Sequence, residues 1–218
     1  MFLAKKSLAF LTLVCLAGAA MPTWAQTADK SARTHEQAMT VAEGRFIQDL
    51  GDRAIKIVAD KKLDEKERNK AFGNILSDSF DLKTIGRFVI GRTWRVATDA
   101  QKDEYMNLFK ALVIRNYGKK IALYTNEGFV VVGTRPETDR DTVVLSQITH
   151  PDGSPATEID WRVRTKNGKS GVIDIVVEGV SLSITQKQEY ASVIQNNGGK
   201  IEGLLDVMRK QLDTPQDE

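Results

Sequence analysis

The stretch that decides the fold spans residues 158–177 and reads EIDWRVRTKNGKSGVIDIVV. Apolar and charged residues alternate from Glu158 to Arg164, which is typical of a strand with one face on a core and one in water. Asn167-Gly168 predicts a tight hairpin turn, because both positions tolerate positive φ. The apolar run 172–177 supplies the returning strand. The segment therefore predicts an antiparallel hairpin.

Two further strands are expected before this hairpin. After Gly128 the period of the apolar residues changes from about 3.6 to 2, first through Phe129 and Val131 and then between residues 143 and 148. Together with the hairpin, these segments predict a meander of at least four strands.

Helical spacing dominates the chain before the sheet. Apolar residues recur three or four apart from near Val41 to Val58, and Asp64 is placed to cap a second helix. Asp81 is placed to cap a short third helix that ends at Gly91. The opening third of the domain is therefore expected to be helical.

Capping signals also mark helices on both sides of the sheet. Thr98 and Gln101 have the spacing of a capping box at the start of a long helix with a broad apolar face. After the sheet, Thr185 and Gln188 have the same spacing, and Gly198-Gly199 predicts a break before a last helix.

This order of elements predicts an α+β domain in which helices cover one face of an antiparallel sheet of at least four strands. The long helix and the strands that contain Trp161 and Ile173 supply more aromatic and branched surface than a two-layer core obviously needs. Such a surplus fits a curved sheet that encloses a pocket, although a dry core is the commoner use of these residues.

The N-terminus has the pattern of a signal peptide. Lys5 and Lys6 precede the apolar run 8–20, and Thr23-Trp24-Ala25 offers small residues before a cut after residue 25. A membrane anchor is the alternative, but the run is shorter than the roughly 20 residues that a spanning helix needs. The expected organisation is a signal peptide at 1–25, a flexible leader at 26–39, one domain at 40–212 and a tail at 213–218.

Removal of residues 1–25 changes the charge balance and the redox chemistry of the chain. The full chain has 31 Lys and Arg and 29 Asp and Glu. Residues 1–25 contain two of the lysines and no acid, so 29 basic and 29 acidic residues remain after cleavage. A net charge near zero and no concentrated basic face in the sequence argue against nucleic acid as a partner. The only cysteine, Cys15, leaves with the signal peptide, so no disulfide is available.

Few residues fit catalysis or metal binding. After cleavage the chain has two histidines, His35 in the leader and His150 in a turn, so metal sites rich in His and Cys are excluded. Glu158 and Asp160 share a strand face and fit a solvated outer surface better than an acid/base pair. Asp174 is the one central-strand acid on which an enzyme could depend. No phosphate-binding glycine loop occurs.

Two motifs resemble the MlaC family of toluene-tolerance, phospholipid-binding auxiliary proteins. The first runs from Gly91 through Trp94-Arg95-Val96-Ala97-Thr98 to Gln101, and the second is Gly179-Val180-Ser181-Leu182. The resemblance extends over about residues 40–212. Residues 186–188 read Gln-Lys-Gln where many relatives have Tyr-Arg, which is a departure from the family pattern.

The resemblance implies a non-enzymatic periplasmic carrier with an NTF2-like fold, no cofactor, and the acyl chains of a glycerophospholipid as cargo. It implies exchange of lipid with an outer-membrane lipoprotein complex and an inner-membrane ABC transporter that has an MCE-domain component, by a protein expected to be a monomer. Alternatives are a carrier of hopanoid or another envelope lipid, an enzyme on the same fold, and an adaptor that binds no lipid.

Periodicity supplies the candidate pocket wall, although each position also fits an ordinary core. We expect the lipid-binding residues to be Val89, Tyr105, Phe109, Leu112, Tyr117, Val144, Ile148, Trp161, Ile173 and Ile175. Trp94 and Arg95 of the first motif are expected to be structural, the Trp as an anchor between helices and the Arg as the partner of a carboxylate.

Overall fold

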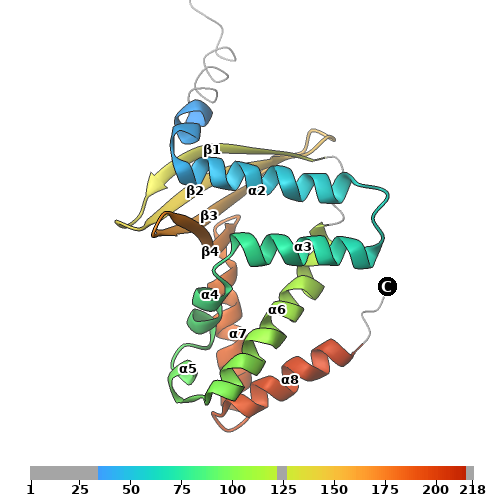
Figure 1. The fold of residues 1–218 in the computed structure, drawn as a ribbon, viewed down its shortest axis with the longest axis vertical. Coiled ribbons are helices and arrows are strands. Elements are labelled where there is room, and N and C mark those ends of the chain that lie inside the picture. Colours follow the sequence, from blue (N-terminus) through green and yellow to red (C-terminus); the bar gives the residue numbers. More distant parts are fainter. Residues whose placement is uncertain (1–33, 122–126, 215–218) are drawn as a thin grey trace, which may run out of the picture.

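The computed structural model describes residues 34–121 and 127–214. Residues 1–25, expected to be a signal peptide, lie outside the described residues, as do the first part of the leader and residues 215–218. Helices come first, a sheet follows and two helices close the chain (Figure 1). The predicted α+β fold is confirmed.

The sheet has five antiparallel strands in the order β1-β2-β3-β4-β5. Asn167 (φ 53°) and Gly168 (φ 75°) form the turn between β3 and β4, as predicted. The strands are β1 (Gly128–Pro136), β2 (Asp141–Thr149), β3 (Thr157–Lys166), β4 (Lys169–Val177) and the two-residue β5 (Val180–Ser181).

Side-chain caps fix the starts of the helices that begin at residues 65, 82 and 99, whereas the helix that begins at residue 42 has no side-chain cap. Asp64 and Glu67 form both bonds of a capping box, and Asp81 accepts a 2.9 Å bond from the Thr84 amide. Thr98 and Gln101 form the predicted box. The helices are α2 (Ala42–Ala59), α3 (Glu65–Ser79), α4 (Leu82–Ile90), α5 (Thr93–Val96), α6 (Asp99–Ile121), α7 (Leu182–Asn196) and α8 (Ile201–Asp213).

The start of α7 differs from the prediction. The helix begins at Leu182, because the Ser181 hydroxyl caps it by accepting a bond from the Ile184 amide. Thr185 lies inside the first turn, where its hydroxyl donates to the Ser181 carbonyl. The short helix α5 was also not predicted.

Order begins earlier than the expected boundary at residue 40. Residues 34–40 are helical, and Ala38 is buried. The His35 ring contacts the Val131 carbonyl of β1 at 2.6 Å. Side-chain contact with the sheet therefore orders the end of the polar segment, which has too little apolar periodicity to reveal a helix.

The domain has two hydrophobic cores. One joins the sheet to α2 and α3, around Ile47, Val144 and Val163. The other joins α4, α6, α7 and α8, around Tyr105, Leu204 and Met208. In Figure 1 the first group of elements forms the upper part of the molecule and the second the lower part.

The arginines on the outer face of β3 form ion pairs with acids. The sequence predicts a merely solvated face, so this part of the prediction is wrong. Arg162 forms two bonds to Glu137, at 2.6 and 3.0 Å. Arg164 forms two 2.7 Å bonds to Asp141, which lower the pKa of that carboxyl. Forked pairs of this kind hold neighbouring segments in a defined register.

Asp174 joins the sheet to α7. Its side chain is 3% exposed and accepts bonds from the Ser183 amide at 3.1 Å and the Ser181 hydroxyl at 2.7 Å. Arg162 adds a 3.3 Å contact. These donors account for both carboxylate oxygens, so the burial of this charge is compensated.

We expect Asp174→Ala to lower the free energy of unfolding by about 2 kcal/mol, because it leaves a buried amide and a guanidinium without their acceptor. The figure is modest because Arg162 is half-exposed and keeps Glu137. Urea unfolding of the variant would measure the loss. Asp78→Ala, an exposed change on α3, is the matched control and should shift the midpoint little. Equal midpoints for both variants would contradict the role given to Asp174.

Candidate functional site

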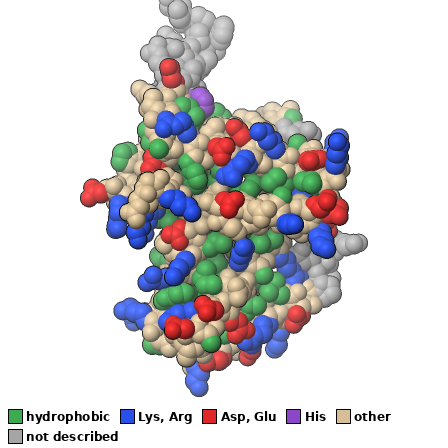
Figure 2. All heavy atoms as spheres, viewed as in Figure 1, with side chains coloured by type: hydrophobic (Ala, Val, Ile, Leu, Met, Phe, Trp, Pro, Cys, Tyr) green, Lys and Arg blue, Asp and Glu red, His purple; other side chains and the backbone are tan. Residues whose placement is uncertain are grey.

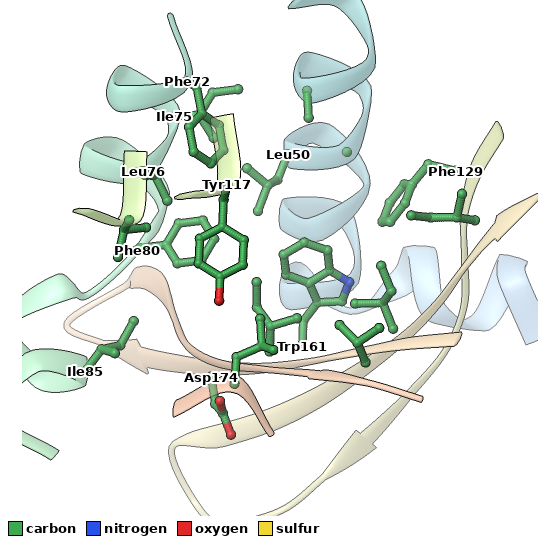
Figure 3. Close-up of a pocket in the computed structure, with 18 of the residues that line it drawn as sticks. Leu50, Phe72, Ile75, Leu76, Phe80, Ile85, Tyr117, Phe129, Trp161 and Asp174 are labelled. Atoms are coloured by element: carbon green, nitrogen blue, oxygen red, sulfur yellow. The ribbon is translucent and has the colours of Figure 1, made fainter. Parts of the chain in front are cut away.

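A cavity of about 490 Å³ lies between the two cores (Figure 3). Its volume is within the range of about 300–1,000 Å³ that is usual for ligand sites. Figure 3 shows Leu50, Phe72, Phe80, Tyr117 and Trp161 around one space, from α2, α3, α6 and the sheet. The wall is almost wholly apolar, and Glu127 and Asp174 are its only charged residues among those described.

Helices α2 and α3 form the wall that faces the sheet. On α2 the lining positions fall three or four residues apart, which is the spacing of one helix face. The wall comprises Leu50, Gly51, Ala54, Ile55 and Val58 from α2, Phe72, Ile75 and Leu76 from α3, and Phe80 directly after α3.

The sheet contributes paired residues from neighbouring strands. Trp161 lies opposite Ile175, and Ile159 lies opposite Val177, so both pairs face the cavity. The Phe129 ring on β1 meets the Trp161 ring edge to face, with centroids 6.2 Å apart. This packing fixes the large indole in the cavity floor.

The second core supplies the remaining wall. Side chains along α4 and α6 and at the start of α7 face the cavity. They are Leu82, Ile85 and Val89 from α4, Phe109, Val113 and Tyr117 from α6, and Leu182, Ser183 and Gln186 from α7. Burial raises the pKa of Tyr117, so its phenol stays neutral.

The polar groups in the wall are engaged within the protein. The Trp161 indole N–H donates to the Ser146 hydroxyl at 2.8 Å, and that hydroxyl donates to the Ile159 carbonyl at 2.9 Å. Such satisfied groups offer a ligand few hydrogen bonds. The cavity is therefore suited to hydrocarbon.

The charged residues of the wall do not form a catalytic pair. Asp174 is held by its three donors, and Glu127 lies 3.5 Å from the His150 ring. The other ring nitrogen of His150 lies 3.0 Å from the Thr157 hydroxyl, so the histidine ties the end of β2 to the start of β3. This agrees with the expectation of a turn residue.

The structure brings together most of the predicted pocket residues. Each comes from a face that periodicity identified as apolar. Those that line the cavity are Val89, Phe109, Tyr117, Ile148, Trp161 and Ile175.

Four predicted residues do not line the cavity. Tyr105 and Leu112 pack in the lower core, where the Tyr105 hydroxyl donates to the Gly86 carbonyl at 3.1 Å. Val144 is fully buried in the upper core. Ile173 is the extra residue of a β-bulge between the pairs Arg162–Asp174 and Val163–Val172. The bulge changes the alternation, so Val172 takes the inward position.

The motif residues Trp94 and Arg95 behave differently from each other. Trp94 packs on the lower core and meets the Tyr105 ring edge to face at 6.4 Å, which confirms the anchor between helices. Arg95 is exposed and pairs with no carboxylate in the part of the chain that the structure describes. The predicted partner for Arg95 is therefore wrong.

Sequence reasoning missed the walls from α2 and α3. One available signal was Gly51, a glycine within the apolar face of α2. A Cβ atom there would lie 2.2 Å from the Phe129 ring, so only glycine lets the helix approach this strand without displacing the ring. This close helix–strand contact lies at the middle of α2, and Gly51 itself belongs to the cavity wall.

Residues 34–121 and 127–214 offer neither a metal site nor a membrane-spanning helix. No group of three or more His, Cys, Asp or Glu side chains is arranged to hold a metal ion there. Within the same residues, no helix is both long enough and apolar enough to cross a membrane.

A family model described as "MlaC protein" matches residues 48–210, which is most of the chain. The chain belongs to the MlaC family. The resemblance carried by the motifs at residues 91–101 and 179–182 is thereby confirmed.

Two MlaC-like proteins show how far the similarity extends. The chain is 22% identical over 170 residues to the toluene tolerance protein ttg2D of Pseudomonas putida, covering 76% of this chain and 77% of that protein. A phospholipid-binding protein from Ralstonia solanacearum, solved in complex with a phospholipid, matches with a TM-score of 0.70 and 24% identity. That match covers 78% of this chain and 98% of the other. At this identity it shows a shared fold.

We expect Ala54→Trp to lower the affinity of the cavity for an apolar dye such as N-phenylnaphthylamine by about tenfold or more, because the indole occupies space between α2 and the sheet. Fluorescence titration would measure this. Ala59→Trp places the same side chain at an exposed position on the same helix and should bind dye like the wild type. Unchanged dye affinity in Ala54→Trp would show that the dye does not use this cavity.

Proposed function

We propose that this chain is a non-enzymatic periplasmic carrier that holds the acyl chains of a phospholipid in the cavity between its two cores. The observation that carries the proposal is the apolar wall with its polar groups already engaged. The headgroup would remain outside, since a phosphate inside would find almost no hydrogen-bond donor and would lose its hydration.

The energetics favour an occupied cavity. An apolar space of about 490 Å³ left without contents would cost the side chains that line it their packing contacts. Water is a poor filler, because a buried water needs two to four polar partners. Each acyl CH₂ that leaves water gains about 0.8 kcal/mol. Hydrocarbon therefore fills this space better than solvent or vacuum.

The relatives support a phospholipid as cargo. The Ralstonia solanacearum protein was solved with a phospholipid bound. The match in fold covers 98% of that protein and 78% of this chain. Membership of the MlaC family further supports transfer between an outer-membrane lipoprotein complex and an inner-membrane ABC transporter with an MCE-domain component. In that role the carrier would maintain the lipid asymmetry of the outer membrane.

The alternative roles are less well supported by the cavity. An enzyme would need a reactive acid, and Asp174 has its oxygens occupied by the start of α7 and by Arg162. An adaptor without cargo would have no need for an apolar cavity. A hopanoid carrier would use the same kind of wall, so the identity of the lipid has to be measured.

The deciding experiment is native mass spectrometry of the protein purified from a Gram-negative periplasm, followed by extraction and identification of the lipid. We expect one glycerophospholipid per chain. A hopanoid would redirect the proposal to another envelope lipid. Protein of bare mass that also takes no lipid from vesicles would refute the carrier.

We also expect Trp161 to be quenched by a phospholipid with brominated acyl chains, since its ring lies in the cavity floor. Trp94→Phe leaves Trp161 as the only tryptophan after residue 25 and should retain the quenching. Trp161→Phe leaves Trp94, which packs in the lower core, and should lose it. Equal quenching of both variants would mean that the acyl chains lie elsewhere.

A further inference from the structure

A second surface combines exposed cations with exposed apolar side chains, and we call it the cationic face. It is formed by Phe88, Arg92, Arg95, Ile184 and Lys187, from α4, α5 and α7. Phe88 is 42% exposed and Ile184 46%. The Lys187 ammonium lies 4.3 Å from the centre of the Phe88 ring, so α4 and α7 meet here. In Figure 2, blue side chains border green ones at the lower left, over α4, and red side chains adjoin the same green group from below.

Acidic residues lie at the margins of the segments that build this face, where Asp81 and Asp99 flank the first segment and Glu178 and Glu189 flank the second. Residues 82–98 contain Lys83, Arg87, Arg92 and Arg95 and no Asp or Glu, and residues 179–188 contain Lys187 and no acid. All five cations are exposed. The sequence indicated no concentrated basic face, because the two segments that form one are far apart along the chain. The fold therefore brings cations from two distant segments to one surface, with acids at its margins.

The cations of the face surround a hollow of about 540 Å³. Arg92, Arg95 and Lys187 line it together, with backbone and apolar side chains of α4 and α7 between them. None of the three forms an ion pair within the described residues. Three unpaired cations around one depression produce a positive potential that attracts anions.

We propose that the cationic face docks on the surface of a membrane that contains anionic phospholipid. Long basic side chains near such a surface gain electrostatic attraction to the lipid phosphates, and exposed apolar side chains enter the boundary between headgroups and acyl chains. The face supplies both, with Arg and Lys for the phosphates and Phe88 and Ile184 for the boundary. This surface goes beyond the proposed carriage of a lipid in the cavity.

The chemistry of the face fits a lipid surface better than a folded acidic partner. Stable protein interfaces have a fully buried core depleted in charge, with the polar residues at the rim. Here a lysine covers the exposed aromatic ring, so the largest apolar side chain of the face lies under a charge. A bilayer surface needs no such core, because its headgroups adapt to the positions of the cations.

The docking face and the cavity share structural elements. Val89 of α4 lines both the cavity and the hollow, and Gln186 of α7 lines the cavity directly before Lys187. A protein held on a membrane by this face would therefore have the walls of its cavity close to the lipid surface.

The test is flotation of the full mature chain with two kinds of vesicle, phosphatidylcholine alone and phosphatidylcholine mixed with phosphatidylglycerol. We expect binding to the mixed vesicles that weakens as salt rises, and little binding to the neutral ones. Neutralising one cation should weaken binding about fivefold, so Arg92→Gln/Arg95→Gln/Lys187→Gln should lose about 100-fold.

The matched control removes three exposed cations from the α2–α3 end of the molecule, as Lys61→Gln/Lys62→Gln/Lys66→Gln. It changes the net charge equally and should bind mixed vesicles much more tightly than the first triple variant. Ile184→Ser should weaken binding without changing its salt dependence.

Three results would overturn the proposal. The first is equal binding of the wild type to both kinds of vesicle, and the second is an equal loss of vesicle affinity in the two triple variants. The third is that the wild type binds no vesicle, which would leave the face to an acidic protein or to no partner. Native mass spectrometry of cargo in the same variants separates docking from carriage. A triple variant that keeps its cargo but no longer floats supports docking, whereas lipid-free wild type that still floats would refute only the carrier.

Discussion

The separation of the apolar interior into two cores is the constraint on which this structure depends. Val144, Val163 and Ile47 lie in the upper core and Tyr105 and Met208 in the lower one, so the buried side chains form two separate clusters. The space between them keeps its apolar wall because the two cores already fix the elements that carry it. A single continuous core would have filled this volume with side chains, as close packing normally does.

Local signals in the sequence were sufficient for most of the fold. Asp64, Asp81 and Thr98 cap helices through hydrogen bonds to residues three positions away, and Asn167-Gly168 forms its turn through its own backbone preferences. Such interactions need no distant partner, so the sequence reveals them. Ser181 caps α7 through an equally local bond from the Ile184 amide, but the spacing of Thr185 and Gln188 offered a competing capping box a few residues later.

The site was less predictable because its residues share their periodicity with the cores. Tyr105 and Phe109 lie on one face of α6, yet the first faces the lower core and only the second also reaches the cavity. Ile173 was misplaced because one bulged residue in β4 changes which side chains point inward. The contribution of α2 and α3, like the concentration of cations from α4, α5 and α7, arises from packing between segments distant in sequence.

The chain of bonds from Trp161 through Ser146 to the Ile159 carbonyl has a consequence for selectivity. A wall whose polar groups are hydrogen-bonded within the protein has no donors or acceptors with which to recognise polar groups of a ligand. Its selectivity depends on the volume of the ligand and on the shape that the ligand can adopt. Discrimination then depends on length and branching, where each additional carbon either gains contact or meets a rigid aromatic surface. A binding site of this kind measures hydrocarbon volume, and it leaves the choice of headgroup to whatever lies outside the wall.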